Sequence, residues 1–367
     1  MATAFSENLT AEQQSQVLQL FQQFQHSTLQ KDLIELKTLK KVEKGGEVLR
    51  IELQLPFAWN TGVEQVKQQL SDALLKATDS KEIKWVVNYQ IATLKRANNQ
   101  PAVKGVKNII AVTSGKGGVG KSSVSVNLAL ALQAQGARVG ILDADIYGPS
   151  VPHMLGVPHQ RPTSPDKRII TPIKAYGLSA NSIGFLMDED NATIWRGPMA
   201  SSALSQLLNE TLWDSLDYLV IDMPPGTGDI QLTLSQQIPV TGAVVVTTPQ
   251  DIALLDAVKG VSMFERVSVP VLGIVENMSM HICSNCGHHE AIFGTEKMAQ
   301  KYNVKVLGQL PLNIQVRQDL DAGKPTVVAA PDSEIAKSFL DLAEKVSTEL
   351  YWQGSVIPSE ILFREVK

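Results

Sequence analysis

The segment GKGGVGKS, residues 115 to 122, restricts the fold of this chain more than any other part of its sequence. The apolar run before it, residues 108 to 114, predicts a strand, and residues 121 to 135 predict a helix. A glycine-rich loop of this spacing between a strand and a helix is the pattern of a phosphate-binding loop. Its glycines let backbone N–H groups converge on phosphate oxygens at the start of the helix. The sequence therefore predicts a P-loop NTPase.

This loop also carries the side chains expected to bind ATP and magnesium. Lys121 is expected to contact the β- and γ-phosphates, and Ser122 to hold Mg²⁺. Lys116 is a second cation, which can reach a nucleotide facing it on a second subunit, although a lone loop lysine is usually only solvated. The loop residues predicted to bind the nucleotide are Gly115, Lys116, Gly117, Gly118, Val119, Gly120, Lys121 and Ser122.

The first part of the chain predicts a small α/β domain, residues 1–95. Its patterns follow the order α-β-β-α-β, with a hairpin around Gly45 and Gly46 and a possible helix cap at Thr61.

The pattern changes after this domain. Residues 96–107 are polar and predict a linker. Residues 108–352 alternate short, nearly continuous apolar strands with helices, which predicts a mostly parallel sheet flanked by helices. Residues 353–367 are left as a C-terminal tail. The predicted fold is thus an α/β P-loop NTPase with a small N-terminal α/β domain.

Three aspartates follow apolar strands of the larger domain. Asp222 ends the run YLVID, and Asp143 and Asp145 close the run RVGILDAD. A phosphotransferase that uses Mg²⁺ needs acidic groups at such strand ends, so Asp222 is predicted as a magnesium ligand. A strand-end aspartate is often only a turn former, but the three together with the loop favour function.

The segment HICSNCGHHE, residues 281 to 290, holds both cysteines of the chain, Cys283 and Cys286. A single CxxC pair can be a redox dithiol, half of a zinc site or half of an iron–sulfur site. Its place after a strand of a nucleotide-binding fold disfavours a redox dithiol. Zinc within one chain would need two more ligands, and His288 and His289 are better explained as solvated loop residues.

A two-fold homodimer would explain both the second lysine and the cysteine pair. A two-fold interface repeats the same surface on both subunits, so two CxxC loops near the axis would supply the four thiolates that iron–sulfur clusters usually require. Lys116 would cross the same interface. Both features therefore point to one assembly.

The pattern KGGVGKS resembles the deviant Walker A family that includes MinD, ParA and the nitrogenase iron protein. The resemblance implies that Lys116 contacts the partner's phosphates and that Asp145, in switch I, positions the attacking water. It also implies that Asn277 holds the adenine and that Pro311 contacts the same base through its backbone. The residues expected to act in catalysis are Lys116, Lys121 and Asp145.

The motifs SGKGGVGKSS, LDADIYGPS, WRGPM, DYLVIDMPPGTGDIQL, TTPQDIAL and ENMS…CSNCG together resemble the bacterial Mrp/ApbC group of iron–sulfur cluster carriers, over about residues 104 to 350. The resemblance implies transient binding of a cluster, its transfer to apo-proteins, work with assembly factors, and slow ATP hydrolysis. The cluster would be of the 4Fe–4S type, held by Cys283 and Cys286 of two subunits. Arg196, in WRGPM, is a feature of the group whose chemistry does not follow from the residues.

Charge and hydropathy exclude several other classes. The net charge of −4 does not favour a nucleic-acid partner, and no apolar run approaches the roughly 20 residues of a membrane helix. No signal peptide is evident, so a cytoplasmic protein with neither nucleic acid nor membrane as partner is expected. Two alternatives stay open: a partitioning ATPase of the ParA/MinD type, and a regulatory ATPase whose dimer is stapled by zinc.

Overall fold

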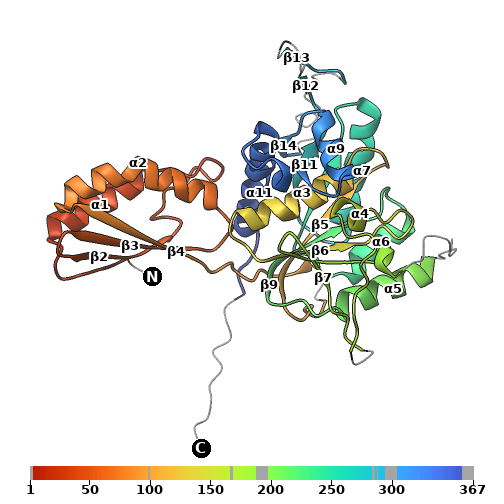
Figure 1. Cartoon of the computed structure of the whole chain (residues 1–367), viewed down its shortest axis with the longest axis horizontal. Coiled ribbons are helices and arrows are strands. Elements are labelled where there is room, and N and C mark those ends of the chain that lie inside the picture. The colour runs from red at the N-terminus through yellow and green to blue at the C-terminus, as the bar shows by residue number, and fades with distance from the viewer. Residues whose placement is uncertain are drawn as a thin grey trace, which may run out of the picture.

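The computed structural model describes residues 3–97, 100–165, 168–186, 197–282, 286, 288–293 and 304–357. Figure 1 shows two α/β bodies side by side, a smaller one formed by the N-terminal part of the chain and a larger one formed by the rest. The larger sheet is mostly parallel and flanked by helices. The α/β fold class predicted from the sequence is therefore confirmed.

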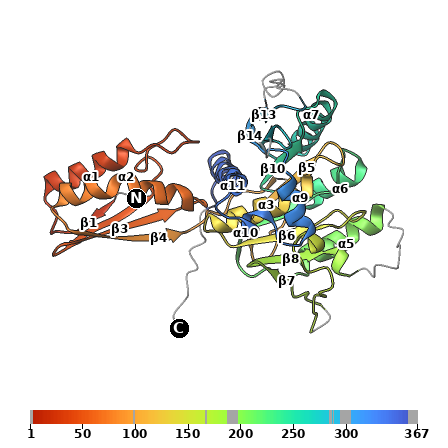
Figure 2. The same ribbon diagram turned by 45° about the horizontal axis from the view of Figure 1, so that its top comes forward.

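The smaller body is a sheet with two helices packed on one of its faces (Figure 2). Its described elements are β1 (Ala4–Phe5), α1 (Ala11–Gln23), β2 (Leu39–Gly45), β3 (Val48–Leu55), α2 (Asn60–Thr78) and β4 (Glu82–Tyr89). The strand order is β1-β2-β3-β4, in which β2 and β3 form the predicted antiparallel hairpin and the other neighbours are parallel. Thr10 begins α1 through a capping box with Gln13, and the helix buries Val17 and Phe21 against the sheet.

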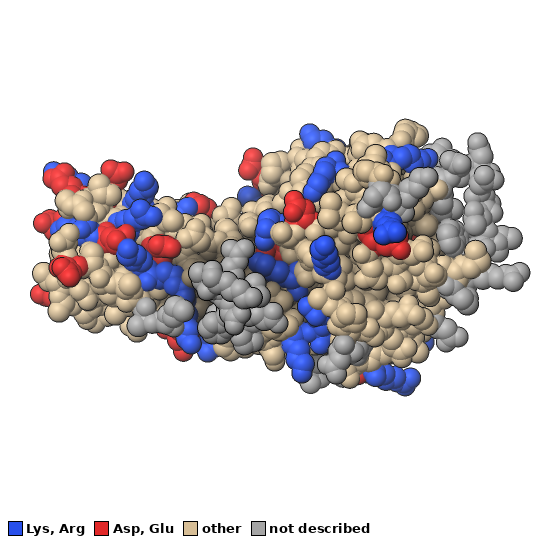
Figure 3. Space-filling model, turned by 90° about the horizontal axis from the view of Figure 1, so that it is seen from below, with Lys and Arg blue, Asp and Glu red and all other residues tan. Residues whose placement is uncertain are grey.

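The other face of this small sheet is polar. Glu43 of β2 forms ion pairs with Lys41 of the same strand and with Arg50 of β3, and Figure 3 shows positive and negative side chains interspersed over this body. One packed face and one solvated face explain why apolar and polar residues alternate along these strands.

The start of α2 differs from the prediction. Thr61 as the helix cap is wrong, because the helix begins at Asn60, one residue earlier, and Trp59 occupies the cap position without a side-chain cap bond. The backbone N–H of Thr61 lies in the first turn and donates to Gln135 Oε1 at 2.9 Å. A residue of the larger body therefore satisfies an N–H group that the helix itself leaves unpaired.

The larger body is built on a sheet in which eight strands are described, with β5 in the middle. The strands are β5 (Val106–Ser114), β6 (Val139–Asp143), β7 (Ile173–Ala175), β8 (Leu178–Ser182), β9 (Leu216–Asp222), β10 (Gly242–Thr247), β11 (Val271–Glu276) and β14 (Val306–Gln309). Their order is β14-β11-β10-β5-β9-β6-β8-β7, and every neighbouring pair is parallel except β7–β8.

Helices cover both faces of this sheet (Figures 1 and 2). One face carries α3 (Lys121–Ala134), α4 (Val151–Met154), α9 (Ile314–Asp321), α10 (Thr326–Ala329) and α11 (Glu334–Gln353). The other carries α5 (Gly197–Asn209), α6 (Asp229–Gln237) and α7 (Asp251–Arg266), and a short 3-10 turn, Ile183–Phe185, follows β8. Because β5 is buried on both faces, apolar residues follow one another without alternation through its middle, from Ile109 to Val112. None of the described helices is long and apolar enough to cross a membrane.

Strands β7 and β8 were not predicted from the sequence. Apart from Leu178, the residues of β8, LSANS, are small or polar, yet all five are buried. Their polar groups are satisfied locally: Asn181 Nδ2 donates to Thr211 Oγ1 at 2.6 Å, and Ser182 Oγ donates to Asp143 Oδ2 at 3.0 Å. Leu178 and Ala180 pack into the core, but with three polar residues beside them the strand has only a weak hydrophobic pattern.

The two bodies meet at the end of α3. The side chain of Gln135 is fully buried, and its Nε2 donates to Thr61 Oγ1 at 2.7 Å and to Leu340 O at 3.0 Å. Ser347 Oγ of α11 donates to Ala58 O at 2.8 Å across the same junction. The helix that starts at the phosphate-binding loop therefore ends against the smaller body.

Replacing Gln135 by Ala should loosen this junction. The Thr61 N–H would lose its acceptor inside a buried contact, which typically costs about 1–3 kcal/mol of unfolding free energy. Urea unfolding of the full chain measures the loss. The matched control is Gln69→Ala, an exposed position of α2, for which a change within about 0.5 kcal/mol is expected. Equal effects of the two substitutions would contradict the assignment.

Candidate functional site

The carboxyl ends of β5, β6 and β9 meet at one edge of the large sheet and bring the predicted site together. The phosphate-binding loop leads from β5 to α3, Asp143 ends β6, and Asp222 ends β9. Because β9 lies between β5 and β6, Asp222 is in register with Val112 on one side and with Asp143 on the other. Ligands of open α/β sheets bind at this kind of edge.

Two of the loop glycines stand where a side chain would collide. Gly120 has φ +80° and begins α3 in the left-handed conformation, and a Cβ there would lie 2.3 Å from Asn277 Nδ2. A Cβ on Gly115 would lie 2.3 Å from the backbone of Asp256 in α7. Gly117 and Gly118, by contrast, are exposed at the tip of the loop with open space around them. The glycines thus allow close packing at the two ends of the loop and leave its middle accessible.

Lys121 is buried among oxygen atoms. Its Nζ donates to Asp222 Oδ1 at 2.7 Å and lies 3.1 Å from Ser122 Oγ and 3.7 Å from Asp145 Oδ2. Ser122 Oγ donates to Asp222 Oδ2 at 2.6 Å, and Ser125 Oγ contacts Asp222 Oδ1 at 2.7 Å. The structure therefore brings Lys121, Ser122, Asp145 and Asp222, four predicted site residues, into one cluster.

Asp143 organises the loop that carries Asp145. Its Oδ1 accepts the N–H of Asp145 at 3.1 Å, and its Oδ2 accepts the N–H groups of Ser150 and Val151, each at 3.1 Å, and the hydroxyl of Ser182. Sequence reasoning grouped Asp143 with Asp145 but gave it no role. Its several donors now identify it as the residue that fixes the loop between β6 and α4.

Burial perturbs both of these carboxyl groups. It raises the pKa of Asp143 to about 7, and the charge of Asp222 adds to the rise while the Lys121 ammonium opposes it. Burial also raises the pKa of Asp145, again against the lowering effect of Lys121. Such perturbed carboxyl groups beside a buried cation are typical of functional sites.

The donor set at this cluster fits magnesium. Mg²⁺ prefers hard oxygen ligands and usually takes only one or two carboxylates from the protein. The Ser122 hydroxyl and the Asp222 carboxylate lie in contact with each other and next to the lysine expected to hold phosphate. Within the described part of the chain, the hydrogen-bond partners of these two side chains are hydroxyl and carboxylate oxygens and the Lys121 ammonium.

Lys116 lies apart from this cluster. Its half-buried side chain places Nζ 3.5 Å from Gln250 Oε1, just before α7, and among the described contacts none joins it to Lys121 or Asp222. The described structure therefore does not bring Lys116 together with the other predicted site residues.

Asn277 and Pro311 line a cavity of about 330 Å³ beside the loop. Asn277 Nδ2 donates to Val119 O at 2.9 Å, which ties the end of β11 to the phosphate-binding loop. Gly120 and Ser123 line the cavity from the loop side. Pro311, which follows β14 in the sequence, also lines it. This position suits a base attached to phosphates held by the loop.

The cysteine segment forms a small hairpin of β12 (His281–Ile282) and β13 (His289–Glu290). Cys286 is exposed, as are His288 and His289, whereas Cys283 and Arg196 lie outside the described residues. His289 Nδ1 lies 3.1 Å from Met280 Sδ. Within the part of the chain that the structure covers, no three His, Cys, Asp or Glu side chains are grouped to hold a metal ion.

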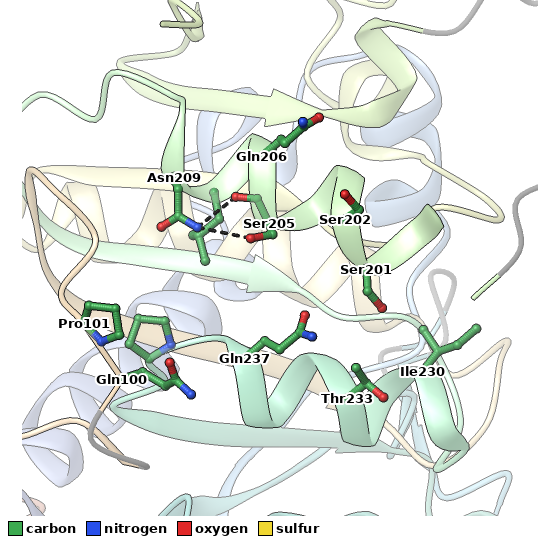
Figure 4. Close-up of a pocket in the computed structure, with 12 residues that line it drawn as sticks. Gln100, Pro101, Ser201, Ser202, Ser205, Gln206, Asn209, Ile230, Thr233 and Gln237 are labelled. Carbon is green, nitrogen blue, oxygen red and sulfur yellow. Dashed lines mark hydrogen bonds between the residues drawn. The ribbon is translucent and has the colours of Figure 1, made fainter. Parts of the chain in front are cut away.

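A second, larger cavity of about 830 Å³ lies between α5 and α6 (Figure 4). Ser201, Ser202, Ser205, Gln206 and Asn209 line one wall, Ile230, Thr233 and Gln237 the other, with Gln100 and Pro101 at one end. No charged side chain is among the described residues of its lining. A nucleotide phosphate would find no cation there, so this cavity does not compete with the loop as the nucleotide site.

Comparison with known proteins assigns the family. A family model described as ParA: NUBPL iron-transfer P-loop NTPase matches residues 105–347. The chain belongs to this family. A protein of Haemophilus influenzae named iron–sulfur cluster carrier protein is 86% identical over 100% of both chains. One of the same name from Escherichia coli K12 is 64% identical over 94% of each chain.

A solved structure supports the fold of this NUBPL-family chain. The nucleotide-binding protein of Archaeoglobus fulgidus in complex with ADP is 36% identical, with a TM-score of 0.56 over 65% of this chain and 93% of that one. Together these matches confirm the predicted resemblance to iron–sulfur cluster carriers and the P-loop NTPase fold.

Replacing Asp143 by Asn should disturb Asp145 without touching the phosphate-binding loop. An amide keeps only one acceptor oxygen and turns an NH₂ group toward N–H donors, so the loop between β6 and α4 loses part of its support. We expect a roughly tenfold or larger fall in the ATP hydrolysis rate, the size of a general positioning effect, with ATP still bound. The control is Asp214→Asn, an exposed aspartate before β9; an unchanged rate in Asp143→Asn would refute the role.

Proposed function

We propose that this chain binds an iron–sulfur cluster, transfers it to apo-proteins, and uses ATP binding and slow hydrolysis in doing so. The observation that carries the proposal is the 86% identity, over the whole of both chains, with a protein named iron–sulfur cluster carrier. The CxxC spacing of Cys283 and Cys286 supports it, since thiolates are the usual ligands of such clusters.

The nucleotide part of the proposal rests on the Lys121 cluster. Magnesium, when bound, neutralises charge that develops on the phosphates. Ser122 and Asp222 are the oxygen donors that would hold it, and Lys121, now 2.7 Å from Asp222, is the cation next to the glycine loop that would turn to the phosphates. Asp145, held by Asp143, orients the attacking water.

The base and the partner subunit complete this site. Asn277 and Pro311 hold the adenine in the cavity beside Val119. Lys116 contacts the phosphates bound to the second subunit of a homodimer, which fits its separation from the Lys121 cluster.

The cluster is the cargo, carried between the two subunits. Two chains supply four thiolates from Cys283 and Cys286, the number that a 4Fe–4S cluster takes. Cys286 is exposed on a small hairpin, and an exposed ligand can be reached by the acceptor protein. Acceptors are apo iron–sulfur proteins, with assembly factors as donors.

Two other functions use the same features. Zinc also binds thiolates, so a regulatory ATPase with a zinc-stapled dimer is the nearest alternative, and a partitioning ATPase is the second. Anaerobic incubation with iron and sulfide separates them. Broad visible absorption with about two irons and two sulfides per chain supports a shared cluster, whereas a colourless protein that binds only zinc would reject it.

Mixing two inactive variants tests whether Lys116 acts across the interface. Lys116→Ala and Lys121→Ala should each hydrolyse ATP poorly alone, because each lacks one cation at the phosphates. In a mixed dimer, one site regains both lysines, so an equimolar mixture should recover about a quarter of the wild-type rate. Lys104→Ala is the control, because this exposed lysine precedes β5 and lies at the end of that strand opposite to the loop. No recovery on mixing would show that Lys116 acts within its own subunit.

Replacing Cys283 or Cys286 by Ser should abolish stable cluster binding and transfer, because each change removes two of four thiolates from a symmetric dimer. ATP hydrolysis should remain measurable, since the nucleotide loop is built from other residues. Iron content, sulfide content and light-scattering mass are measured on the same samples, with Ser284→Ala as the control that keeps both thiolates. A double cysteine variant with normal iron and sulfide would sink the bridging model, as would a fully loaded monomer.

A further inference from the structure

The outer edge of β4 is open in the described structure. β4 is the last strand in the order β1-β2-β3-β4, and its pairing partner is β3. The even-numbered residues along this segment turn their N–H groups toward β3: Glu82 donates to Glu47 O, Gln90 to Leu55 O and Ala92 to Pro56 O. By the alternation of a strand, Ile83, Trp85, Val87 and Tyr89 turn their N–H and C=O groups to the outer side. Such an edge is a template for a further strand.

The C-terminal part of the chain already pairs along the same side. Ile357 N donates to Thr93 O at 2.8 Å, and Lys95 N donates to Ser355 O at 2.8 Å, around the antiparallel bridge between Leu94 and Val356. Residues 355–357 therefore run antiparallel to residues 93–95, which follow β4 in the sequence. Thr93 and Lys95, both odd-numbered, make the hydrogen bonds to them. The next residues of the tail, if they keep this direction, pass along the open edge.

We propose that the outer edge of β4 is a strand-docking surface and that its occupant is the C-terminal segment of this same chain, residues 358–367, added antiparallel as a fifth strand. The ten residues of this segment span about 33 Å when extended, at about 3.3 Å per residue. Counted from the bridge between Leu94 and Val356, residues 361–367 fall opposite residues 89 to 83, which are seven of the eight residues of β4.

The bridge between Leu94 and Val356 fixes the register. Each step forward along the tail is one step back along β4, so Pro358 falls opposite Ala92. The N–H of Ile357 points toward the β4 side and donates to Thr93 O. Because successive residues of a strand turn to opposite sides, the backbone nitrogen of Pro358 would point away from β4. Proline is tolerated at such a position because no ladder bond is lost. Ile91 O also accepts from Lys107 Nζ at 3.1 Å, and a carbonyl oxygen has a second lone pair for a strand partner.

The same register matches apolar side chains across the edge. Val87 and Tyr89 pack against the core of the smaller body and are half-buried. The ring of Tyr89 also lies against Gly136 at the end of α3. Ile361 falls beside Tyr89, and Phe363 beside Val87, on the face that the helices cover. Cross-strand pairs of aromatic and β-branched residues are the stabilising kind.

The docked tail would tie the two bodies together. It follows α11 of the larger body after a few residues and would end on the sheet of the smaller one. This adds a second connection to the one that Gln135 makes at the end of α3.

Disulfide trapping tests the register. In a full chain with Ser at both native cysteine positions, Arg364→Cys is combined with Val86→Cys, its partner in the proposed register on the polar face, where paired Cβ atoms lie about 4.5–5.5 Å apart. The matched control combines Arg364→Cys with Glu82→Cys, four residues along the same face of β4. We expect the first pair to form an intramolecular disulfide at least tenfold faster. Equal rates, no disulfide, or mainly covalent dimers would overturn the proposal, the last by assigning the edge to a second copy.

Hydrogen exchange gives an independent answer without cysteines. The full chain is compared with a chain that ends at Ile357. The amides of Ile83, Trp85, Val87 and Tyr89 should exchange at least tenfold slower in the full chain, because the docked tail pairs with them. The amides of Lys84 and Val86 face β3 and should stay protected in both, which shows that the shortened chain is folded. Unchanged exchange of the outer amides would refute the docking.

Discussion

Lys121 carries a positive charge into the interior of the large body, and the arrangement around it depends on how that charge is balanced. The side chain is 6% exposed, and Asp222, which is fully buried, lies 2.7 Å away. Removing one partner of such a buried pair leaves an uncompensated charge and costs about 3–5 kcal/mol. Asp222 reaches Lys121 because β9 lies directly beside β5 in the sheet. The order of the strands therefore determines that the lysine of the phosphate-binding loop has a carboxylate partner. The loop also places Ser122 against the same carboxylate.

Much of this could be predicted because the determining features are local in sequence. The loop is one uninterrupted motif, and Asp143 and Asp222 each stand at the end of an apolar run, so the edge where they meet follows from a parallel sheet. The features that escaped prediction depend on contacts between distant residues. β8 is buried through hydrogen bonds of Asn181 and Ser182, and the first turn of α2 is satisfied by Gln135, 74 positions away along the chain. Propensity and periodicity carry no information on such pairs.

The role of Asp143 in the site also could not be predicted from the local sequence. A strand-end aspartate in the sequence has the same appearance whether it contacts a ligand or holds a loop. The structure separates the two roles, because the oxygens of Asp143 accept from Asp145, Ser150, Val151 and Ser182, whereas Asp222 faces Lys121 and Ser122. Only the folded arrangement shows that the oxygens of Asp143 are occupied by hydrogen bonds from neighbouring backbone and hydroxyl groups, whereas those of Asp222 face Lys121 and Ser122.

The nucleotide loop and the cysteine hairpin share their supports. Asn277 contacts Val119 of the loop through its side chain and Thr247 through its backbone. A few residues later, Ser279 N donates to Leu310 O, and His281, at the start of the hairpin, forms a bridge with Leu312. Pro311, between these two leucines, lines the cavity beside the loop. The base of the hairpin is therefore hydrogen-bonded to the residues that surround the proposed adenine position. A displacement of residues 310–312 would move the segment that leads to Cys283. With the cluster held on this hairpin, as proposed, these contacts would connect it to the nucleotide by a path of a few residues.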